Sequence, residues 1–386
     1  MRLPLLAAAL VAVPALSACT QNASSGEAGE DDRTITVSST DDACELSGTE
    51  APSGKLTFDV TNDGSKVTEF YLYTENAERV LGEVENIGPG LTRQLVVSAP
   101  AGTYLTACKP GMKGDGIRAD FTVTDSGAKV AASADEAELV EHAEEEYGEF
   151  VQEQSDQLLT GTAAFVKAYK AGDDRAAKAL YPEVRTHWER IETVAESFGD
   201  LDPKMDAREA DLEPGQKWTG WHRMEKDLWP ARAEKYESLT MKQRAVYADD
   251  LLANTKVLDH RIGELEFTVD QIANGSRGLM EEVATGKVTG EEEYWSRTDL
   301  WDFQANVDGA KKAFEVVEPI LEQNDPELEE TLDERFDALQ EQLDAHREGD
   351  GFRTYDYLSA EEVKQLADAV NALSEPLSHL TAAVIS

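Results

Sequence analysis

The sequence predicts two domains of different classes, an N-terminal all-β sandwich and a C-terminal all-α helical bundle. Residues 33–125 contain short runs of β-branched and aromatic residues, and turn signals separate these runs. In residues 138–386, apolar residues recur at helical spacing, with Glu, Lys and Ala on the other faces. A chain of 386 residues is also long enough to build two hydrophobic cores.

The N-terminus is expected to be a lipoprotein signal peptide covering residues 1–18. The apolar run Leu3–Leu16 is too short to span a bilayer as an ordinary helix, and it leads into the motif Leu16-Ser17-Ala18-Cys19. This motif resembles the bacterial lipobox, which implies cleavage before Cys19 and lipid on that cysteine. The lipid would hold the exported protein on the extracytoplasmic face of the bacterial membrane, in the periplasm or at the cell surface. A plain secretory signal is the alternative. Residues 19–32 are small and polar, which is typical of a flexible tether.

Six strands are expected in the β domain. Turn signals such as Asn62-Asp63-Gly64 separate them, and short strands at this spacing favour an antiparallel sandwich. The expected strands are Thr34–Ser38, Lys55–Thr61, Glu69–Thr74, Thr92–Ser98, Gly102–Ala107 and Ile117–Thr124.

The segment Gly102–Met112 resembles the last loop of cupredoxins, in which a strand ends in a cysteine before a loop that holds His and Met ligands. The resemblance implies a cupredoxin-like fold for residues 33–125. A blue-copper centre needs two histidines besides its thiolate. The first histidine of this chain is His142, which lies outside the domain. The ordinary copper centre is therefore excluded, and copper is a disfavoured ligand of this domain.

Two interpretations of the remaining cysteines stay open. Without Cys19, the mature chain contains only Cys44 and Cys108. An exported protein meets an oxidising compartment, so a disulfide is the default expectation. Alternatively, both thiolates belong to an unusual metal site that is completed by carboxylates such as Glu45 or Glu69.

Residues 126–137 are small and polar and are expected to link the domains. The breaks between the helices that follow carry Gly, Asp or Pro, and such short connections favour antiparallel neighbours in a bundle. The expected helices are 138–171, 174–198, 216–236, 240–263, 270–285, 298–323, 326–347 and 359–383.

His222 and Glu225 are the first candidates for metal ligation. Three residues advance a helix by about 300°, so both side chains share one face, one turn apart. An imidazole nitrogen and a carboxylate oxygen held in this way form half of a metal site. The spacing alone is weak, because His142 and Glu145 match it and such pairs are often surface hydrogen bonds. Gly220 strengthens the case, because it allows another backbone to approach closely.

Carboxylates on neighbouring helices are needed to complete such a site, as in bundle proteins that bind metal in their cores. Helix placement suggests Asp249, Glu282 and Glu192 as the further ligands. Most other acidic residues must be solvated, because a buried carboxylate is costly unless it is paired or bound to metal.

The pattern Gly220-x-His222-x-x-Glu225 in a helical domain resembles the imelysin-like family. Longer stretches match as well, among them His187–Glu192, Asp202–Asp206 and Thr298–Asn306. The family has been classed with peptidases and includes bacterial iron-uptake proteins. The resemblance implies that His222 and Glu225 are a metal-binding pair in an imelysin-like bundle.

The function implied by this resemblance is that of an extracytoplasmic, lipid-anchored iron-binding component of a bacterial iron-uptake system. Its implied partners are an Ftr1-like iron permease and a haem peroxidase of the same system. Carboxylates with one imidazole suit Fe3+ or Fe2+, and zinc is a plausible substitute. The net charge of −41 concentrates cations and argues against a nucleic-acid partner.

Two other functions remain as alternatives. One is a metallopeptidase of the imelysin class, although the chain has no His-Glu-x-x-His signature. The other is a surface adhesin or polysaccharide-binding lipoprotein that uses its sandwich for ligand contact. Catalytic residues are not assigned, and peptidase activity is disfavoured.

Overall fold

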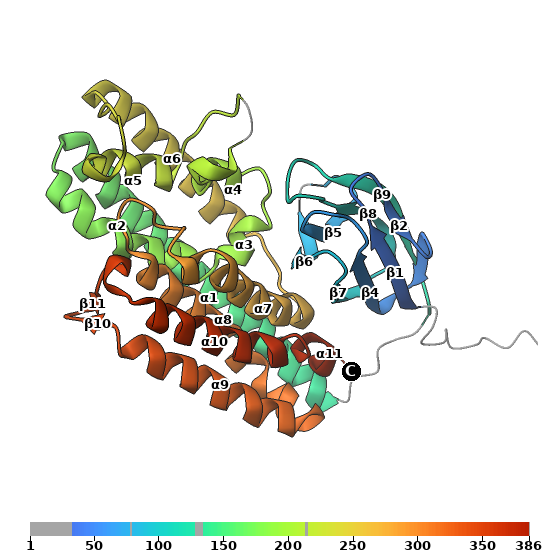
Figure 1. Cartoon of the computed structure of the whole chain (residues 1–386). Helices are drawn as coiled ribbons and strands as arrows, with labels where there is room; N and C mark the ends of the chain where they lie inside the picture. Colours follow the sequence, from blue (N-terminus) through green and yellow to red (C-terminus); the bar gives the residue numbers. More distant parts are fainter. Residues whose placement is uncertain (1–32, 78, 128–133, 213–214, 386) are drawn as a thin grey trace, which may run out of the picture.

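A computed structural model describes residues 33–77, 79–127, 134–212 and 215–385. Figure 1 shows a β-sandwich lying against one end of a larger helical domain. The two fold classes and their order along the chain are those that the sequence predicts. The predicted signal peptide and Cys19 lie outside the described residues. None of the helices within the described ranges is both long and apolar enough to cross a bilayer.

The β domain contains two sheets. One has the strand order β2 (Cys44–Leu46), β1 (Thr34–Ser39), β4 (Gly54–Asn62), β7 (Thr92–Ala99), and the other has the order β3 (Glu50–Pro52), β9 (Ile117–Thr124), β8 (Gly102–Cys108), β5 (Thr68–Thr74), β6 (Val80–Ile87). The expectation of a fully antiparallel sandwich was wrong, because β1 pairs with β4 and β3 with β9 in parallel. Alternate side chains of β4 and β5 fill the core, where Phe58 packs against Phe70 and Phe121.

Strand β6 was not predicted. Its buried residues Gly82, Val84 and Ile87 face the sandwich, whereas Glu83 and Glu85 point away from the core. The two glutamates weaken the apolar signal of a strand. They lie on the side of the strand that faces the helical domain, where they line a cavity.

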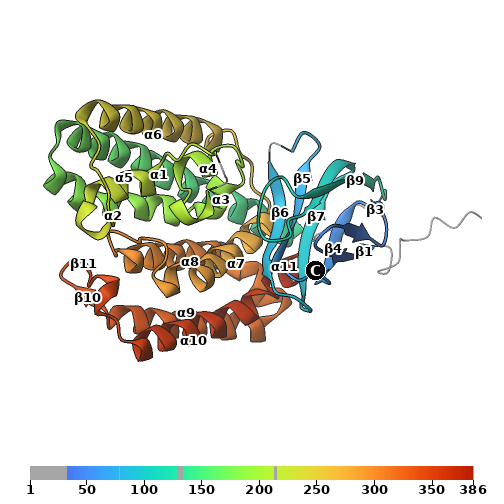
Figure 2. The same ribbon diagram turned by 45° about the horizontal axis from the view of Figure 1, so that its top comes forward.

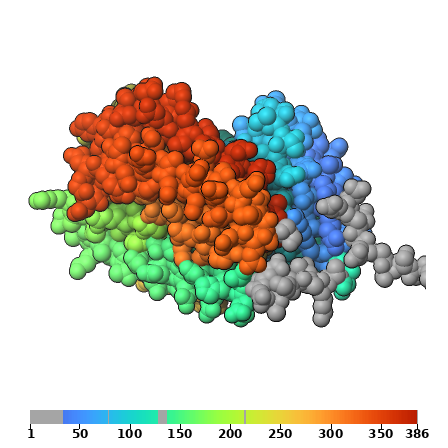
Figure 3. Space-filling view, turned by 90° about the horizontal axis from the view of Figure 1, so that it is seen from below, coloured from blue at the N-terminus to red at the C-terminus, as the bar shows by residue number. Residues whose placement is uncertain are grey.

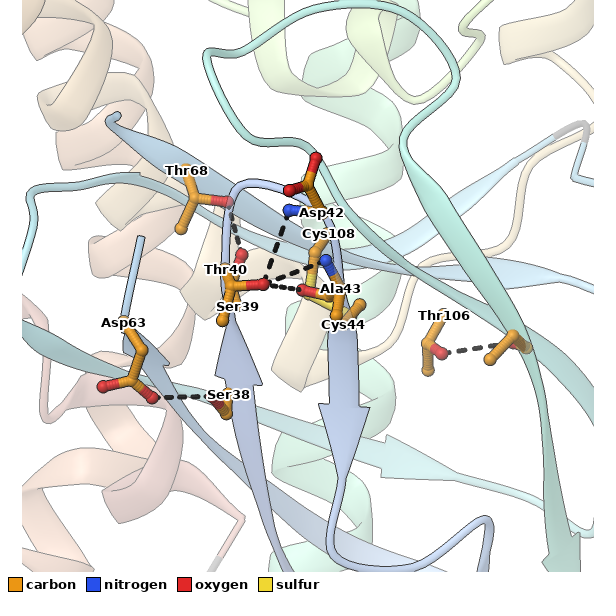
Figure 4. The surroundings of a disulfide bond; sticks show 11 residues. Ser38, Ser39, Thr40, Asp42, Ala43, Cys44, Asp63, Thr68, Thr106 and Cys108 are labelled. Carbon is orange, nitrogen blue, oxygen red and sulfur yellow. Dashed lines mark hydrogen bonds between the residues drawn. A yellow bond between two sulfur atoms is a disulfide. The ribbon is translucent and has the colours of Figure 1, made fainter. Parts of the chain in front are cut away.

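Cys44 and Cys108 form a disulfide, which joins a strand of one sheet to a strand of the other (Figure 4). Beside it, the hydroxyls of Ser39 and Thr68 are hydrogen-bonded across the sheets at 2.8 Å. The disulfide leaves neither sulfur as a thiolate, so the alternative of a thiolate metal site is corrected. Glu45 is exposed, and the buried Glu69 accepts a hydrogen bond from a tyrosine hydroxyl rather than facing a thiolate.

The helical domain contains eleven α-helices within the described residues. They are α1 (Ala134–Ala171), α2 (Asp174–Glu189), α3 (Glu192–Glu196), α4 (Asp202–Met205), α5 (Trp221–Leu228), α6 (Met241–Ile262), α7 (Val269–Thr285), α8 (Asp299–Asn324), α9 (Pro326–Asp344), α10 (Ala360–Leu377) and α11 (Leu380–Val384). Helix α8 is central and packs against α1, α2, α7 and α9 (Figure 2). It is buried on most of its surface, as expected of a helix surrounded by others.

Three predicted helices differ from the structure. The helix expected over 174–198 breaks after Glu189 and resumes as α3, the helix expected over 216–236 is reduced to α5, and the helix expected over 359–383 is divided into α10 and α11. The second difference arises because Gly220 has a φ of 87°, which is outside the helical region. Helix α1 begins at Ala134, before its predicted start at residue 138.

The two domains meet where α7 packs against β6 and β7 (Figures 1 and 2). The carboxylate of Asp270 accepts a hydrogen bond from the backbone N–H of Ser98 at 2.9 Å, and Arg93 pairs with Glu281 at 2.6 Å. From below, the β domain stands beside the C-terminal helices (Figure 3). The contact therefore combines a hydrogen bond to the backbone of β7 with an ion pair, and both join β7 to helix α7.

Candidate metal centre

Gly220 sets the start of helix α5. A Cβ at this position would lie 2.1 Å from the Met205 carbonyl oxygen and 2.8 Å from that of Lys204. Only glycine tolerates both this contact and its positive φ. The close approach brings His222 beside Asp206, which follows directly after helix α4.

His222 is fully buried and is surrounded by carboxylates. Its Nε2 atom lies 3.2 Å from Glu292 Oε1 and 3.4 Å from Asp206 Oδ1. On the other side of the ring, Nδ1 lies 3.4 Å from Glu225 Oε2 and 4.0 Å from Glu293 Oε1. Ligand atoms of Asp206, His222 and Glu292 all lie within 4.8 Å of one another, as do those of His222, Glu225 and Glu293. We call these five residues the metal centre.

The orientation of Glu225 is fixed by the backbone of the loop before α8. Its Oε1 atom accepts hydrogen bonds from the N–H groups of Trp295 and Ser296, at 2.7 and 2.6 Å. The other oxygen, Oε2, is thereby directed towards His222. Because Glu292 and Glu293 come from the same loop, these two hydrogen bonds help to position their carboxylates together with that of Glu225.

Arg185 of helix α2 supplies the main positive charge beside the centre. It is fully buried, pairs with Asp206 and Glu189, and lies 2.6 Å from Glu293 Oε1. Burial disfavours its charge, but Asp206 and Glu189 outweigh burial and raise the pKa of Arg185 well above its ordinary value. Burial likewise opposes the charge of His222, while Asp206 and hydrogen bonds to carboxylates raise the pKa of its imidazole to about 10.

The centre still has an excess of buried acid. Asp302 is fully buried, and its nearest cation is Arg185, whose Nε lies 3.6 Å from Asp302 Oδ2; one oxygen of the buried Asp299 has no hydrogen-bond partner among the described residues. Burial, followed by repulsion from Glu225, raises the pKa of Glu293 well above its ordinary value, and burial also raises that of Asp302. A buried carboxylate without a partner is costly. A metal cation would supply the missing positive charge, and carboxylate oxygens with one imidazole nitrogen suit iron, manganese or zinc.

The structure brings His222 and Glu225 together but does not bring Asp249 to them. Asp249 lies on the exposed face of α6 and pairs with Lys170. The prediction that Asp249 is a ligand of this centre is therefore corrected. Acid composition alone did not show which face of α6 is turned towards solvent.

Glu192 and Glu282 lie in neighbouring groups rather than among the atoms around His222. Both oxygens of Glu192 accept hydrogen bonds from Lys287 Nζ, at 2.9 and 2.7 Å. Ligand atoms of Glu192 and Glu282 form a second group with Glu196. Glu192 and Glu282 therefore lie beside the His222 site and not in it, which corrects the prediction that they complete that site.

The sequence did not assign Asp206, Glu292 or Glu293 as ligands, and it gave no sign of the pairing role of Arg185. Asp206 lies in a stretch that supports the family resemblance, and the run Glu291–Glu293 stands out by its charge. Neither signal identifies which of these acids is buried. A cavity of about 520 Å³ leads from His222 and Glu292 to the surface between Arg208 and Tyr294.

Comparison with known proteins agrees with this architecture. The imelysin family model matches residues 143–380, and the cupredoxin-like domain model matches residues 6–123. The iron uptake system component EfeO of Escherichia coli (strain K12) is 37% identical over 349 residues, which is 90% of each chain. An Efem/EfeO family lipoprotein of Staphylococcus haemolyticus is 43% identical over 244 residues, covering 62% of this chain and 83% of the relative.

A crystal structure of a Parabacteroides distasonis protein matches with a TM-score of 0.50 and 16% identity, over 67% of this chain and 98% of the other. At this identity the match concerns the fold alone. The two family models together with the extended identity to EfeO decide the assignment. The chain belongs to the imelysin family, as an EfeO-type protein in which a cupredoxin-like domain precedes the helical domain.

Proposed function

We propose that this protein captures iron outside the cytoplasmic membrane at the metal centre and delivers it to a membrane permease. The observation that carries the proposal is the arrangement of four carboxylates around the buried imidazole of His222. The names of the EfeO relatives, which describe components of an iron uptake system, support iron as the cargo. Oxygen-rich donors with one imidazole fit Fe2+ or Fe3+ better than a soft metal such as Cu+.

The location follows from the N-terminal sequence. A signal peptide over 1–18, lipid on Cys19 and a tether over 19–32 would hold the two domains, 33–125 and 138–386, near the membrane. A relative named as a lipoprotein supports this arrangement. Anchoring raises the local concentration of loaded protein at the permease without a new contact. The permease is of the Ftr1-like class, and a haem peroxidase of the same system is the further partner.

Iron binding by purified protein tests the centre. The double variant His222→Gln, Glu225→Gln keeps side chains of similar size, and the amide oxygen introduced at position 225 could still accept the loop hydrogen bonds. We expect its affinity for Fe2+ under anaerobic conditions to fall by roughly 100-fold or more, because even outer-shell changes cost about 10–100-fold. Calorimetric titration would measure the loss.

The chain offers a matched control. His142 and Glu145 have the same spacing on helix α1, but both side chains are exposed. The variant His142→Gln, Glu145→Gln should bind iron as the wild type does. Equal binding by the His222 variant and the wild type would contradict the proposed centre. Metal-dependent cleavage of a peptide library, lost in Glu225→Gln, would support the peptidase alternative instead.

A further inference from the structure

A group of carboxylates from both domains meets in the space between them. Glu83 and Glu85 come from strand β6, Glu196 from helix α3 and Glu282 from helix α7. All four line the same two adjoining cavities, of about 80 Å³ and 750 Å³. Figures 1 and 2 both show β6 beside α7, so the strand and the helix are neighbours in space. We call these residues the interdomain carboxylates.

Their charge is poorly compensated. Ligand oxygens of Glu192, Glu196 and Glu282 lie within 4.8 Å of one another, but Lys287 is hydrogen-bonded to Glu192. No hydrogen bond or ion pair joins Glu196 to a cationic side chain among the described residues. Burial and then neighbouring glutamates raise the pKa of Glu196 and of Glu282. Acids still outnumber the cationic side chains that line the two cavities, which are Arg79, Lys109, Lys113, Arg118, Arg208 and Arg277.

On the β-domain side, a single tyrosine hydroxyl lies within hydrogen-bonding distance of two glutamates. The Tyr71 hydroxyl lies 2.7 Å from Glu85 Oε1 and 3.0 Å from Glu69 Oε2. A phenol has one proton to donate. One of the two carboxylates therefore lacks this donor at any moment, so the Tyr71 hydroxyl does not satisfy both of them.

An independent feature of the smaller cavity also points to a ligand. Tyr147 of helix α1 is only 2% exposed and lines this cavity with Glu196 and Glu282, yet its hydroxyl has no hydrogen-bond partner among the described residues. Thr193 Oγ1, which lines the same cavity, is also unpartnered within the part of the chain that the structure describes. Both oxygens lie near Gly275, at 3.7 and 3.3 Å from where its Cβ would be. Buried hydroxyls normally find a partner.

We propose that the space between the domains is a second cation site, formed by Glu83, Glu85, Glu196 and Glu282, for a hard metal cation such as Fe2+ or Mn2+. The cavity of about 80 Å³ has room for a cation with one or two waters, each of which takes about 30 Å³. These waters would bond the Tyr147 and Thr193 hydroxyls. Carboxylate oxygens without thiolate or imidazole favour such hard cations.

The second site is connected to the metal centre. The larger cavity extends from Glu83 and Glu85 to Asp206 and Glu292, which are members of that centre. Glu192 stands between them, because its ligand oxygens group with Glu196 on one side and with Asp206 on the other. A cation moving between the two sites would stay among carboxylates. The domain interface thus provides a loading or release position for the buried centre.

Counting bound Mn2+ in the full mature chain tests this inference separately from the proposed function. We expect two ions per chain in the wild type, and one in the variant Glu196→Gln, Glu282→Gln. The variant His222→Gln, Glu225→Gln should also bind one, and the combined variant none. Electron paramagnetic resonance of free Mn2+ would give the counts, and circular dichroism would check folding.

Two further variants complete the experiment. Glu83→Gln, Glu85→Gln should likewise lose one ion, because β6 supplies half of the ligands. Glu318→Gln, Glu329→Gln changes a more open acidic group on α8 and α9 and should retain both ions. The second site is refuted if the Glu196 and Glu83 variants bind as many ions as the wild type. If only the His222 variant still binds two Mn2+ ions per chain, the proposed metal centre is contradicted and the second site is supported.

Discussion

Replacing Gly220 with alanine tests how the metal centre is assembled. A Cβ there would lie 2.1 Å from the Met205 carbonyl oxygen, and the φ of 87° is unfavourable for any other residue. Backbone strain contributes about 1–3 kcal/mol, and forcing two packed segments apart contributes about 1–3 kcal/mol more. We expect Gly220→Ala to lose about 4 kcal/mol, which lowers the Tm of a domain of this size by roughly 10 °C.

The same change should weaken iron binding. Met205 immediately precedes Asp206, so a shift of Met205 moves the Asp206 carboxylate away from Nε2 of His222. Scanning calorimetry gives the Tm, and iron titration of the folded protein gives the affinity. Gly215→Ala is the matched control, because Gly215 has a φ of 93° but nothing within 4 Å of its Cβ position. If both variants were equally stable and bound iron equally well, the reasoning about close approach would be refuted.

Three further predictions concern stability. Burial, with a smaller contribution from Arg190, lowers the pKa of His187 to about 4, so stability from its neutral form is present above about pH 6.5 and is lost as the pH falls towards 4. Urea unfolding would measure this loss. Between neutral pH and pH ~5, the free energy of unfolding of the wild type should fall by about 1 kcal/mol more than that of His187→Gln, a value reduced to allow for the partial exposure of the side chain. Identical losses in the two proteins would contradict this. The disulfide joins cysteines 64 residues apart, so Cys44→Ser should cost about 4 kcal/mol by loop entropy, and reductant should destabilise the wild type but not the variant. Lys287→Met removes the cation that two buried glutamates share, Glu189 and Glu192, and should cost about 3–5 kcal/mol, although Glu189 keeps its pair with Arg185. Lys311→Met, at a partly exposed ion pair, should change little, and equal effects of the two variants would show that the buried pairing is unimportant.

Local patterns identified much of the fold. The change from short β-branched runs to helical spacing separated the sandwich from the bundle, because both periods are properties of neighbouring residues. Strand β6 escaped detection because Glu83 and Glu85 interrupt its apolar pattern. The same glutamates lie between the domains, so the part of the sandwich that departs most from a strand pattern belongs to the proposed second site.

The candidate centre was predicted only in part, for a related reason. Glu292 lies 70 residues from His222 along the chain, and nothing in its local sequence distinguishes it from the exposed Asp249. Both are acidic residues, and only the packing of distant segments makes Glu292 buried and leaves Asp249 in solvent. Arg185 could not be placed for the same reason, because packing alone decides that it is completely buried among the carboxylates.

The sequence by itself determined the pairing of His222 with Glu225, since three residues in a helix return a side chain to nearly the same face. It also indicated that glycine at position 220 allows another backbone to approach closely, but only the structure shows that the backbone leaves the helical region there. The tertiary structure decided which distant acids surround the imidazole and which oxygens lack a partner. Burial depends on the packing of helices and on the contact between the domains, and these involve residues that are far apart in the chain.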